Sequence, residues 1–327
     1  MRRFISFLLV LALTLGGLAF WWVNQPMNLA APTLDLSVEP GTAPRTVAQD
    51  TVASGVQTSP ALLYWWFRLS GQARLIKAGS YELETGLTPL TLLTKLTRGE
   101  EALRSVTLVE GWTFKQVREE LLKAEHLTSD IKGIEANLVM KKLGKPGLHP
   151  EGRFYPDTYT YAKGTTDVKV LQRAMRAMDH HLAAAWALRA PNSPLKTQDE
   201  LLTLASIVEK ETGRASDRPM IASVFSNRLR LGMMLQTDPT VIYGMGEQFD
   251  GNLRRSDLLT DTPWNTYTRS GLPPTPIAMP GKASLLAAAQ PATSNALYFV
   301  ARGDGSSQFS DNLDAHNRAV NKFQRGQ

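Results

Sequence analysis

Cysteine is absent from the 327 residues of this chain, and histidine is scarce. Without cysteine the chain has no disulfide bonds, no thiolate catalysis and no metal sites built on sulfur. No HExxH or similar spacing joins the histidines as metal ligands. They are His126, His149, His180, His181 and His316. The sequence therefore predicts neither a metal site nor any other cofactor.

Dense runs of lysine and arginine are also missing, and no basic helix carries interleaved aromatic residues. Nucleic acid is therefore not an expected partner. The formal net charge is nevertheless +6, which suits an anionic lipid surface or an acidic polymer. A hydrophobic content of 43% and a charged content of 20% indicate a folded chain with one large domain or two smaller ones.

One long hydrophobic run is present, at the amino terminus. Arg2 and Arg3 precede apolar residues that extend from Phe4 to Val23 and end in two tryptophans. About 20 apolar residues span a bilayer as a helix, and flanking arginines favour the cytoplasmic side. A cleaved signal peptide is the alternative, with a weak cleavage site at 28–31. We expect an uncleaved single-pass anchor at 1–23, with the rest of the chain outside.

The remaining chain predicts an α+β fold in three parts. Residues 24–44 are rich in proline, alanine and polar residues and predict a linker with one short strand at 34–38. Residues 45–103 predict a small α+β module, and residues 104–327 predict a larger mixed α+β domain. Periodicity and capping residues predict helices at 60–69, 88–96, 113–122, 167–190, 197–213, 218–231 and 314–323. Strands are expected at 77–83, 105–109 and 297–301.

The helix expected at 197–213 carries an unusual carboxyl group. Thr197 and Glu200 have the spacing of a capping box. At 100° per residue, Glu209 lies on the apolar side of the helix, whereas Glu211 lies at its edge. Because a buried carboxylate costs free energy, such a group tends to hold its proton, as a general acid must. The alternative is a structural ion pair between Glu209 and an arginine such as Arg228.

Polar residues gather downstream of this helix in segments that predict binding loops. Amide, hydroxyl and phenol groups of this kind suit sugar hydroxyl and acetamido groups, and a tyrosine ring suits the apolar face of a sugar. An equally simple interpretation of the loop residues is a turn or a cap. The candidates are Asn227, Gln236, Asp238, Asn265 and Tyr267.

Several ordered motifs together resemble the YceG-like family of endolytic murein transglycosylases. The resemblance covers about residue 105 to the end of the chain, with the anchor and the small module in the expected order. The motifs lie at 109–112, 154–159, 204–212, 222–229, 235–244, 265–267, 271–274 and 312–317.

This resemblance implies a single-pass protein of the inner, cytoplasmic membrane, with its catalytic domain in the periplasm. It also implies that residues 45–103 form a LysM-like glycan-binding subdomain, and that Glu209 is the catalytic glutamate. The implied reaction cuts the β-1,4 bond from N-acetylmuramic acid to N-acetylglucosamine in nascent glycan strands and leaves 1,6-anhydro ends. Such cleavage would end strand growth near the synthases, and penicillin-binding proteins and cell-wall synthesis complexes are the implied partners besides peptidoglycan and the membrane.

Two alternatives remain at the level of the sequence. A hydrolase normally uses two carboxylates, in which case Glu211 or Asp238 would be the second one. A membrane-anchored peptidoglycan-binding scaffold for cell-wall synthases would have no activity at all. A serine or metal hydrolase is not expected, because the chain has no GxSxG and no HExxH motif.

Overall fold

Helix α1 (Arg2–Val23) is long and apolar enough to cross a membrane, and it is the one such helix among the residues that the structure describes. The computed structural model describes residues 2–326. Side chains of α1 are exposed over most of its length, whereas Val23 at its end is buried. An exposed apolar helix of this length is what a membrane anchor requires.

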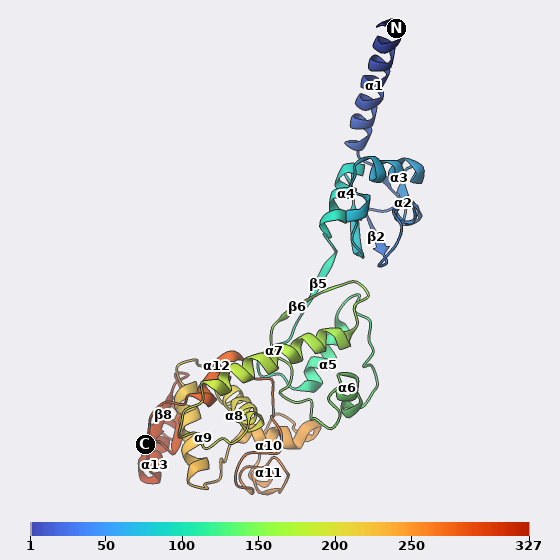
Figure 1. Cartoon of the computed structure of the whole chain (residues 1–327). Coiled ribbons are helices and arrows are strands. Elements are labelled where there is room, and N and C mark those ends of the chain that lie inside the picture. Colours follow the sequence, from blue (N-terminus) through green and yellow to red (C-terminus); the bar gives the residue numbers. More distant parts are fainter. Residues whose placement is uncertain (1, 327) are drawn as a thin grey trace. The chain divides into compact units, whose positions relative to one another are not determined.

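The chain divides into two compact units (Figure 1). The first consists of residues 1–104 together with 160–164, and the second of residues 105–159 together with 165–327. Both contain helices and short two-stranded sheets, so the fold is α+β, as predicted.

The first unit packs three helices around a small antiparallel sheet. Its two main strands pair in register from Thr33↔Glu84 to Val38↔Gly79, and their buried side chains join those of the helices in one core. Its strands are β1 (Asn28–Leu29), β2 (Thr33–Val38), β3 (Val56–Gln57) and β4 (Gly79–Glu84). Its helices after the anchor are α2 (Pro44–Ala53), α3 (Pro60–Leu69) and α4 (Pro89–Arg98).

The strand expected at 34–38 is confirmed as β2, but the linker expected at 24–44 is part of the first unit. Strands β1 and β2 lie inside it, and each pairs with a later strand of the first unit. Leu36 and Val38 contribute to the core. Strand β1 was not predicted, because a strand of two residues has no periodicity to detect.

Helix α4 follows its sequence signals closely. Thr88 caps the first turn by accepting a hydrogen bond from the backbone of Thr91, and Pro89 occupies the first helical position. Gly99 ends the helix with a left-handed φ of 72°, a conformation that favours glycine. The predicted helix at 88–96 is confirmed.

The second unit is mostly helical, with short strands near its two ends. The strands are β5 (Leu103–Thr107), β6 (Thr158–Ala162), β7 (Tyr298–Ala301) and β8 (Ser307–Ser310), of which β5 begins and β6 ends in the first unit. The helices are α5 (Phe114–Lys123), α6 (Ala136–Lys142), α7 (Asp167–Ala187), α8 (Gln198–Glu211), α9 (Arg218–Arg230), α10 (Asp238–Met245), α11 (Arg255–Leu259), α12 (Lys282–Ala289) and α13 (Leu313–Gln324).

Helix α8 is the centre of the second unit. Helices α7, α9 and α12 all pack against it, and every residue from Leu201 to Val208 is buried. The predicted division of α8 into an apolar and a polar side is therefore wrong for its middle. A helical wheel separates faces only where one side of a helix meets water, and α8 meets water only near its ends.

Candidate active site

The end of α8 brings two glutamates, Glu209 and Glu211, into different surroundings. At its start, Thr197 accepts a hydrogen bond of 3.1 Å from the backbone of Glu200, so the predicted cap forms. At its end, the helix stops at Glu211 and Thr212 is extended. The buried middle fixes the helix in the unit, and both carboxyl groups are therefore held in set positions.

Glu209 is enclosed by an ion pair and a backbone donor. Its side chain is 5% exposed, and Oε1 lies 3.3 Å from Nη2 of Arg218. Its Oε2 accepts a hydrogen bond of 2.9 Å from the backbone N–H of Gly281, the residue that precedes α12. The arginine partner is thus Arg218, and the pairing with Arg228 considered from the sequence is wrong. Both oxygens of the Glu209 carboxyl group are therefore engaged by other residues.

A second carboxyl group, Glu110, lies beside this ion pair. A Cβ added to Gly281 would come within 1.8 Å of Oε1 of Glu110, so the Glu110 side chain occupies the space that a larger residue would need. Partial burial raises the pKa of Glu110, and the negative charge of Glu209 raises it further, while Arg218 acts in the opposite direction. Glu110, Glu209 and Arg218 therefore form one charged cluster at the start of α12.

Glu211 lies instead in the wall of a cavity of about 660 Å³. Its Oε1 accepts a hydrogen bond from the hydroxyl group of Thr237. Burial is the main cause that raises the pKa of Glu211 to about 6; the nearby charge of Asp238 raises it too, and Thr237 and Arg228 lower it. A carboxyl group with a pKa near neutrality can give and take a proton during a reaction.

Three of the residues predicted from the sequence share this cavity with Glu211: Gln236, Asp238 and Tyr267. The Tyr267 hydroxyl group donates a hydrogen bond of 2.6 Å to Oδ1 of Asp238, and burial raises the pKa of the tyrosine. Gln236 has a φ of 48°, which is rare for a residue other than glycine. Such backbone strain is common where a chain is shaped around a binding site.

The other two predicted residues, Asn227 and Asn265, are not part of the cavity lining and bond to the backbone. The Asn265 side chain is buried, and its amide nitrogen reaches three carbonyl groups between Asp257 and Thr260. Its Oδ1 accepts a hydrogen bond of 2.8 Å from the backbone of Tyr267, which fixes that tyrosine. Asn227 donates to the carbonyl groups of Ser294 and Ala296 at 2.9 Å. Both asparagines therefore position neighbouring segments, and their predicted contacts with substrate stay predictions.

Arg228 connects two walls of the same cavity. Its Nε donates a hydrogen bond of 2.7 Å to the carbonyl of Leu297, and its Nη1 donates one of 2.8 Å to the carbonyl of Leu235. The guanidinium lies 5.1 Å from the ring centre of Tyr298, which stacks in turn on His316. The cavity therefore combines a titratable carboxyl group with aromatic rings and a fixed positive charge.

A further cavity, of about 770 Å³, is lined by Lys210 and by Pro239, Ile242 and Tyr243 of α10. Its wall includes Glu151, which is 3% exposed. Glu151 accepts hydrogen bonds from the backbone of Phe114 at 2.9 Å and from the hydroxyl group of Tyr243 at 3.0 Å. Burial raises its pKa to about 7 in spite of these bonds.

Comparison with known proteins decides the family. The model of the YceG-like family matches residues 36–322. This chain belongs to the YceG-like family. It is 30% identical over 308 residues to an endolytic murein transglycosylase of Bacillus subtilis. This match covers 89% of this chain and 85% of that protein.

Two further relatives support the membership of this chain in the YceG-like family. An endolytic murein transglycosylase of Streptococcus pneumoniae is 29% identical over 75% of this chain and 50% of its own length. The crystal structure of a YceG-like protein from Listeria monocytogenes matches with a TM-score of 0.56 and 28% identity, over 88% of this chain and 98% of that one.

Three residues near Glu209 were not predicted from the sequence to have a role: Glu110, Arg218 and Gly281. Glu110 lies in a motif that carried the family resemblance, but no periodicity relates residues 109–112 to the end of α8. The link is tertiary: Gly111 donates to the carbonyl of Met279, just before α12. Among residues 2–326, no three histidine, aspartate or glutamate side chains are grouped as metal ligands.

Proposed function

We propose that this protein is a membrane-anchored lytic transglycosylase of peptidoglycan. It would cut the β-1,4 bond from N-acetylmuramic acid to N-acetylglucosamine within glycan strands and leave 1,6-anhydro ends. The relative of Bacillus subtilis, named for endolytic murein transglycosylase activity and matched over most of both chains, supports this proposal. The cavity around Glu211 supports it independently, because sugars bind to aromatic rings and polar groups arranged in this way.

The geometry favours Glu211 over Glu209 as the acid and base. The observation that carries this choice is that Glu211 lies in the cavity with Gln236 and Asp238, with its pKa raised to about 6. Glu209 has both oxygens engaged, one by Arg218 and one by Gly281. A general acid must reach the glycosidic oxygen with a free proton. The prediction of Glu209 from the sequence therefore stays a prediction, with Glu211 as the stronger candidate.

The reaction needs one carboxyl group in two successive roles. Protonated Glu211 gives its proton to the glycosidic oxygen as the bond from C1 of N-acetylmuramic acid breaks. The carboxylate then takes the proton of the C6 hydroxyl group, whose oxygen closes onto C1. Water is not consumed, and Glu211 ends in its starting state. Tyr267, Asp238 and Gln236 would hold the sugars, and Arg228 would keep the two walls of the cavity together.

Glu209 is proposed to act as a positioning residue. Its bonds to Arg218 and Gly281 join the ends of α8, α9 and α12, and thereby fix the last turn that carries Glu211. Removing one partner of a buried ion pair leaves an uncompensated charge, which costs about 3–5 kcal/mol. Loss of Glu209 should therefore reduce stability as well as activity.

The test compares Glu211→Gln with Glu209→Gln in the full-length protein, with isolated glycan strands as substrate and mass spectrometry of the products. We expect wild type to produce anhydro ends and Glu211→Gln to produce none while its thermal midpoint is unchanged or raised. Glu209→Gln should keep measurable cleavage and have a lowered midpoint. The wild-type rate should fall as the pH rises through about 6, because Glu211 loses its proton there.

Each of the other results points to a specific alternative. Loss of cleavage only in Glu209→Gln would return the acid and base role to Glu209. Reducing ends in place of anhydro ends would mean hydrolysis, with Asp238 as a second carboxylate. Binding of glycan without any cleavage by the wild type would favour the non-catalytic scaffold.

The location proposed for the protein follows from the charge flanking α1. Arg2 and Arg3 would stay in the cytoplasm, so that both units face the periplasm. There, residues 45–103 would act as a LysM-like glycan-binding subdomain. Penicillin-binding proteins and other cell-wall synthesis complexes are the proposed partners, and cleavage near them would end strand growth. Alkaline phosphatase fused after residue 327 should be active, because this enzyme folds only outside the cytoplasm.

A further inference from the structure

The outer face of helix α3 is unusually apolar for a surface exposed to water. Leu62, Trp65 and Leu69 are 51%, 53% and 79% exposed, while Leu63 and Phe67 of the same helix are fully buried. The spacing of the three exposed residues places them on one stripe of the helix. A contiguous apolar stripe of this kind generally marks a surface that binds something.

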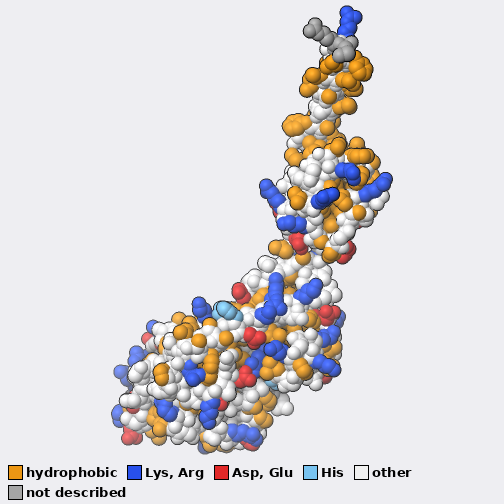
Figure 2. All heavy atoms as spheres, viewed as in Figure 1, with side chains coloured by type: hydrophobic (Ala, Val, Ile, Leu, Met, Phe, Trp, Pro, Cys, Tyr) orange, Lys and Arg blue, Asp and Glu red, His pale blue; other side chains and the backbone are white. Residues whose placement is uncertain are grey.

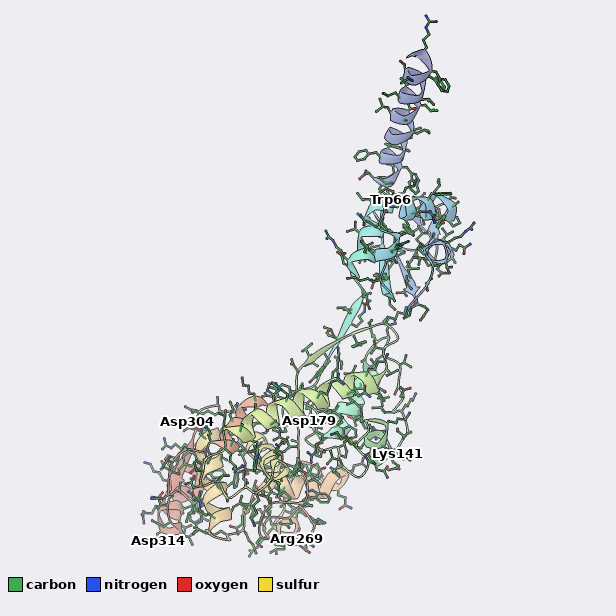
Figure 3. The ribbon with its side chains drawn as sticks, viewed as in Figure 1. Trp66, Lys141, Asp179, Arg269, Asp304 and Asp314 are labelled. Carbon is green, nitrogen blue, oxygen red and sulfur yellow. The ribbon has the colours of Figure 1, made fainter. Side chains whose placement is uncertain are left out.

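This stripe lies at the end of the first unit next to the anchor. The last residues of α1 pack into the core of the first unit: Val23 is buried, and Trp22 contacts the cluster that contains Leu63 and Phe67. Figure 1 shows α3 at the end of the unit from which α1 projects, and Figure 3 shows Trp66 there. Hydrophobic side chains continue from α1 onto this end of the unit (Figure 2).

The composition of this region is that of a membrane interface. Of the seven tryptophans in the chain, four lie at Trp21, Trp22, Trp65 and Trp66. Tryptophan concentrates at the boundary between lipid and water, where its ring is apolar and its N–H is polar. Trp66 donates its N–H to the carbonyl of Pro89, at 3.0 Å, and is thereby fixed within the unit. Trp65 is exposed, so its ring can contact lipid.

The charges on and beside α3 also suit an anionic surface. The single charged residue of α3 is Arg68, which is exposed, and the helix contains no acidic residue. Arg45 of α2 lies 5.7 Å from the ring centre of Tyr64 on the same helix. Exposed arginines next to an apolar stripe bind anionic headgroups while the stripe enters the acyl boundary.

We infer that the stripe formed by Leu62, Trp65 and Leu69 binds the headgroup region of the bilayer that α1 spans. This inference rests on the membrane anchoring included in the proposed function. A bilayer is favoured over a second copy of the chain because α1 brings the lipid surface to α3 in every molecule. A tethered surface has a high effective concentration, so even a small apolar stripe stays bound. The first unit would thus be held flat against the membrane.

The absence of cysteine makes a direct test possible. Single substitutions Leu69→Cys and Leu259→Cys introduce one spin label each into the full-length protein. Leu259 is the matched control, because it is a leucine at 71% exposure in helix α11 of the second unit. The labelled proteins are placed in vesicles of phosphatidylethanolamine and phosphatidylglycerol, and the collision rates of the label with oxygen and with a water-soluble nickel complex are measured.

We expect the ratio of oxygen to nickel collisions to be several-fold higher at position 69 than at position 259. Equal ratios at the two positions would overturn the inference. Contact with a second copy of the chain would also overturn it. In that case the label at position 69 would be shielded from both reagents, and a label-to-label distance would be measurable that disappears on dilution with unlabelled protein.

A third label separates this inference from the proposed anchoring. Leu13 lies in the middle of α1 and is 67% exposed. A lipid-like ratio for Leu13→Cys, together with a water-like ratio for Leu69→Cys, would overturn only the binding of α3. A water-like ratio at both positions would overturn the anchoring as well. Glycan cleavage by the same samples tests the enzymatic proposal separately.

Discussion

Replacement of Glu151 by glutamine should stabilise the second unit by an amount that grows as the pH rises from acid to neutral. Glu151 is buried, and burial raises its pKa from the ordinary value of 4.5 to about 7. Glutamine has nearly the same shape and can still accept from the backbone of Phe114, while the hydroxyl group of Tyr243 turns to accept from its amide nitrogen. The substitution therefore removes a buried charge without removing either contact.

The size of the effect follows from the difference in pKa. In the folded state Glu151 binds its proton up to about pH 7, but in the unfolded state only up to about 4.5. Between these values the folded protein binds more protons, so the stability of the wild type falls as the pH rises. The cost is about 1 kcal/mol at pH 5, about 2 at pH 6 and about 3 at pH 8, at 1.36 kcal/mol per pKa unit.

Thermal unfolding of the full-length protein in detergent measures this cost. For a unit of this size, about 3 kcal/mol corresponds to about 6–12 °C in the midpoint. We expect Glu151→Gln to melt higher than the wild type by an amount in this range at pH 8. The two proteins should melt together at pH 4, where both states of the wild type carry the proton.

Glu247 provides the matched control, because it lines the same cavity as Glu151 but is exposed. A hydrogen bond and ion pair with Lys115 lower its pKa. Its contribution to stability is therefore present at neutral pH and is lost in acid, which is the opposite direction. Glu247→Gln should lower the midpoint slightly at pH 8. Stabilisation by Glu151→Gln that is equal at pH 4 and pH 8, or no stabilisation at either, would refute the reasoning.

Two further predictions concern the residues around the candidate site. Gly281→Ala should cost about 1–3 kcal/mol, because the new Cβ would clash with the Glu110 side chain, although the φ of −81° at this position suits any residue. Thermal midpoints should show that Glu110→Ala restores most of this loss in the double variant, and a purely additive double variant would contradict the clash. Asn265→Ala should cost about 2 kcal/mol and reduce kcat for glycan cleavage, because the backbone N–H of Tyr267 loses its acceptor, Oδ1 of Asn265. Unchanged kinetics would mean that Tyr267 does not need this support.

Local signals in the sequence were sufficient for the elements that carry strong caps or periodicity. The helix at 60–69 has the predicted bounds, and the predicted helices at 88–96, 197–213 and 218–231 each lie within two residues of the observed start and end. The helices that went unpredicted are α2, α6, α10, α11 and α12. Four of these have eight residues or fewer, which is about two helical turns at most and too short for an apolar period to stand out.

The apolar amino-terminal helix, the α+β class, the long helices and the family could all be predicted from the sequence, because each depends on composition or on residues close together in the chain. The sequence also brought attention to the end of α8, where both glutamates lie. The different surroundings of the two glutamates became visible only in the tertiary structure. Arg218 and Gly281 enclose Glu209, whereas Thr237 and Asp238 leave Glu211 in a cavity with a raised pKa. Two residues on one helical turn differ in this way because burial and charge are set by other segments, which no helical wheel contains.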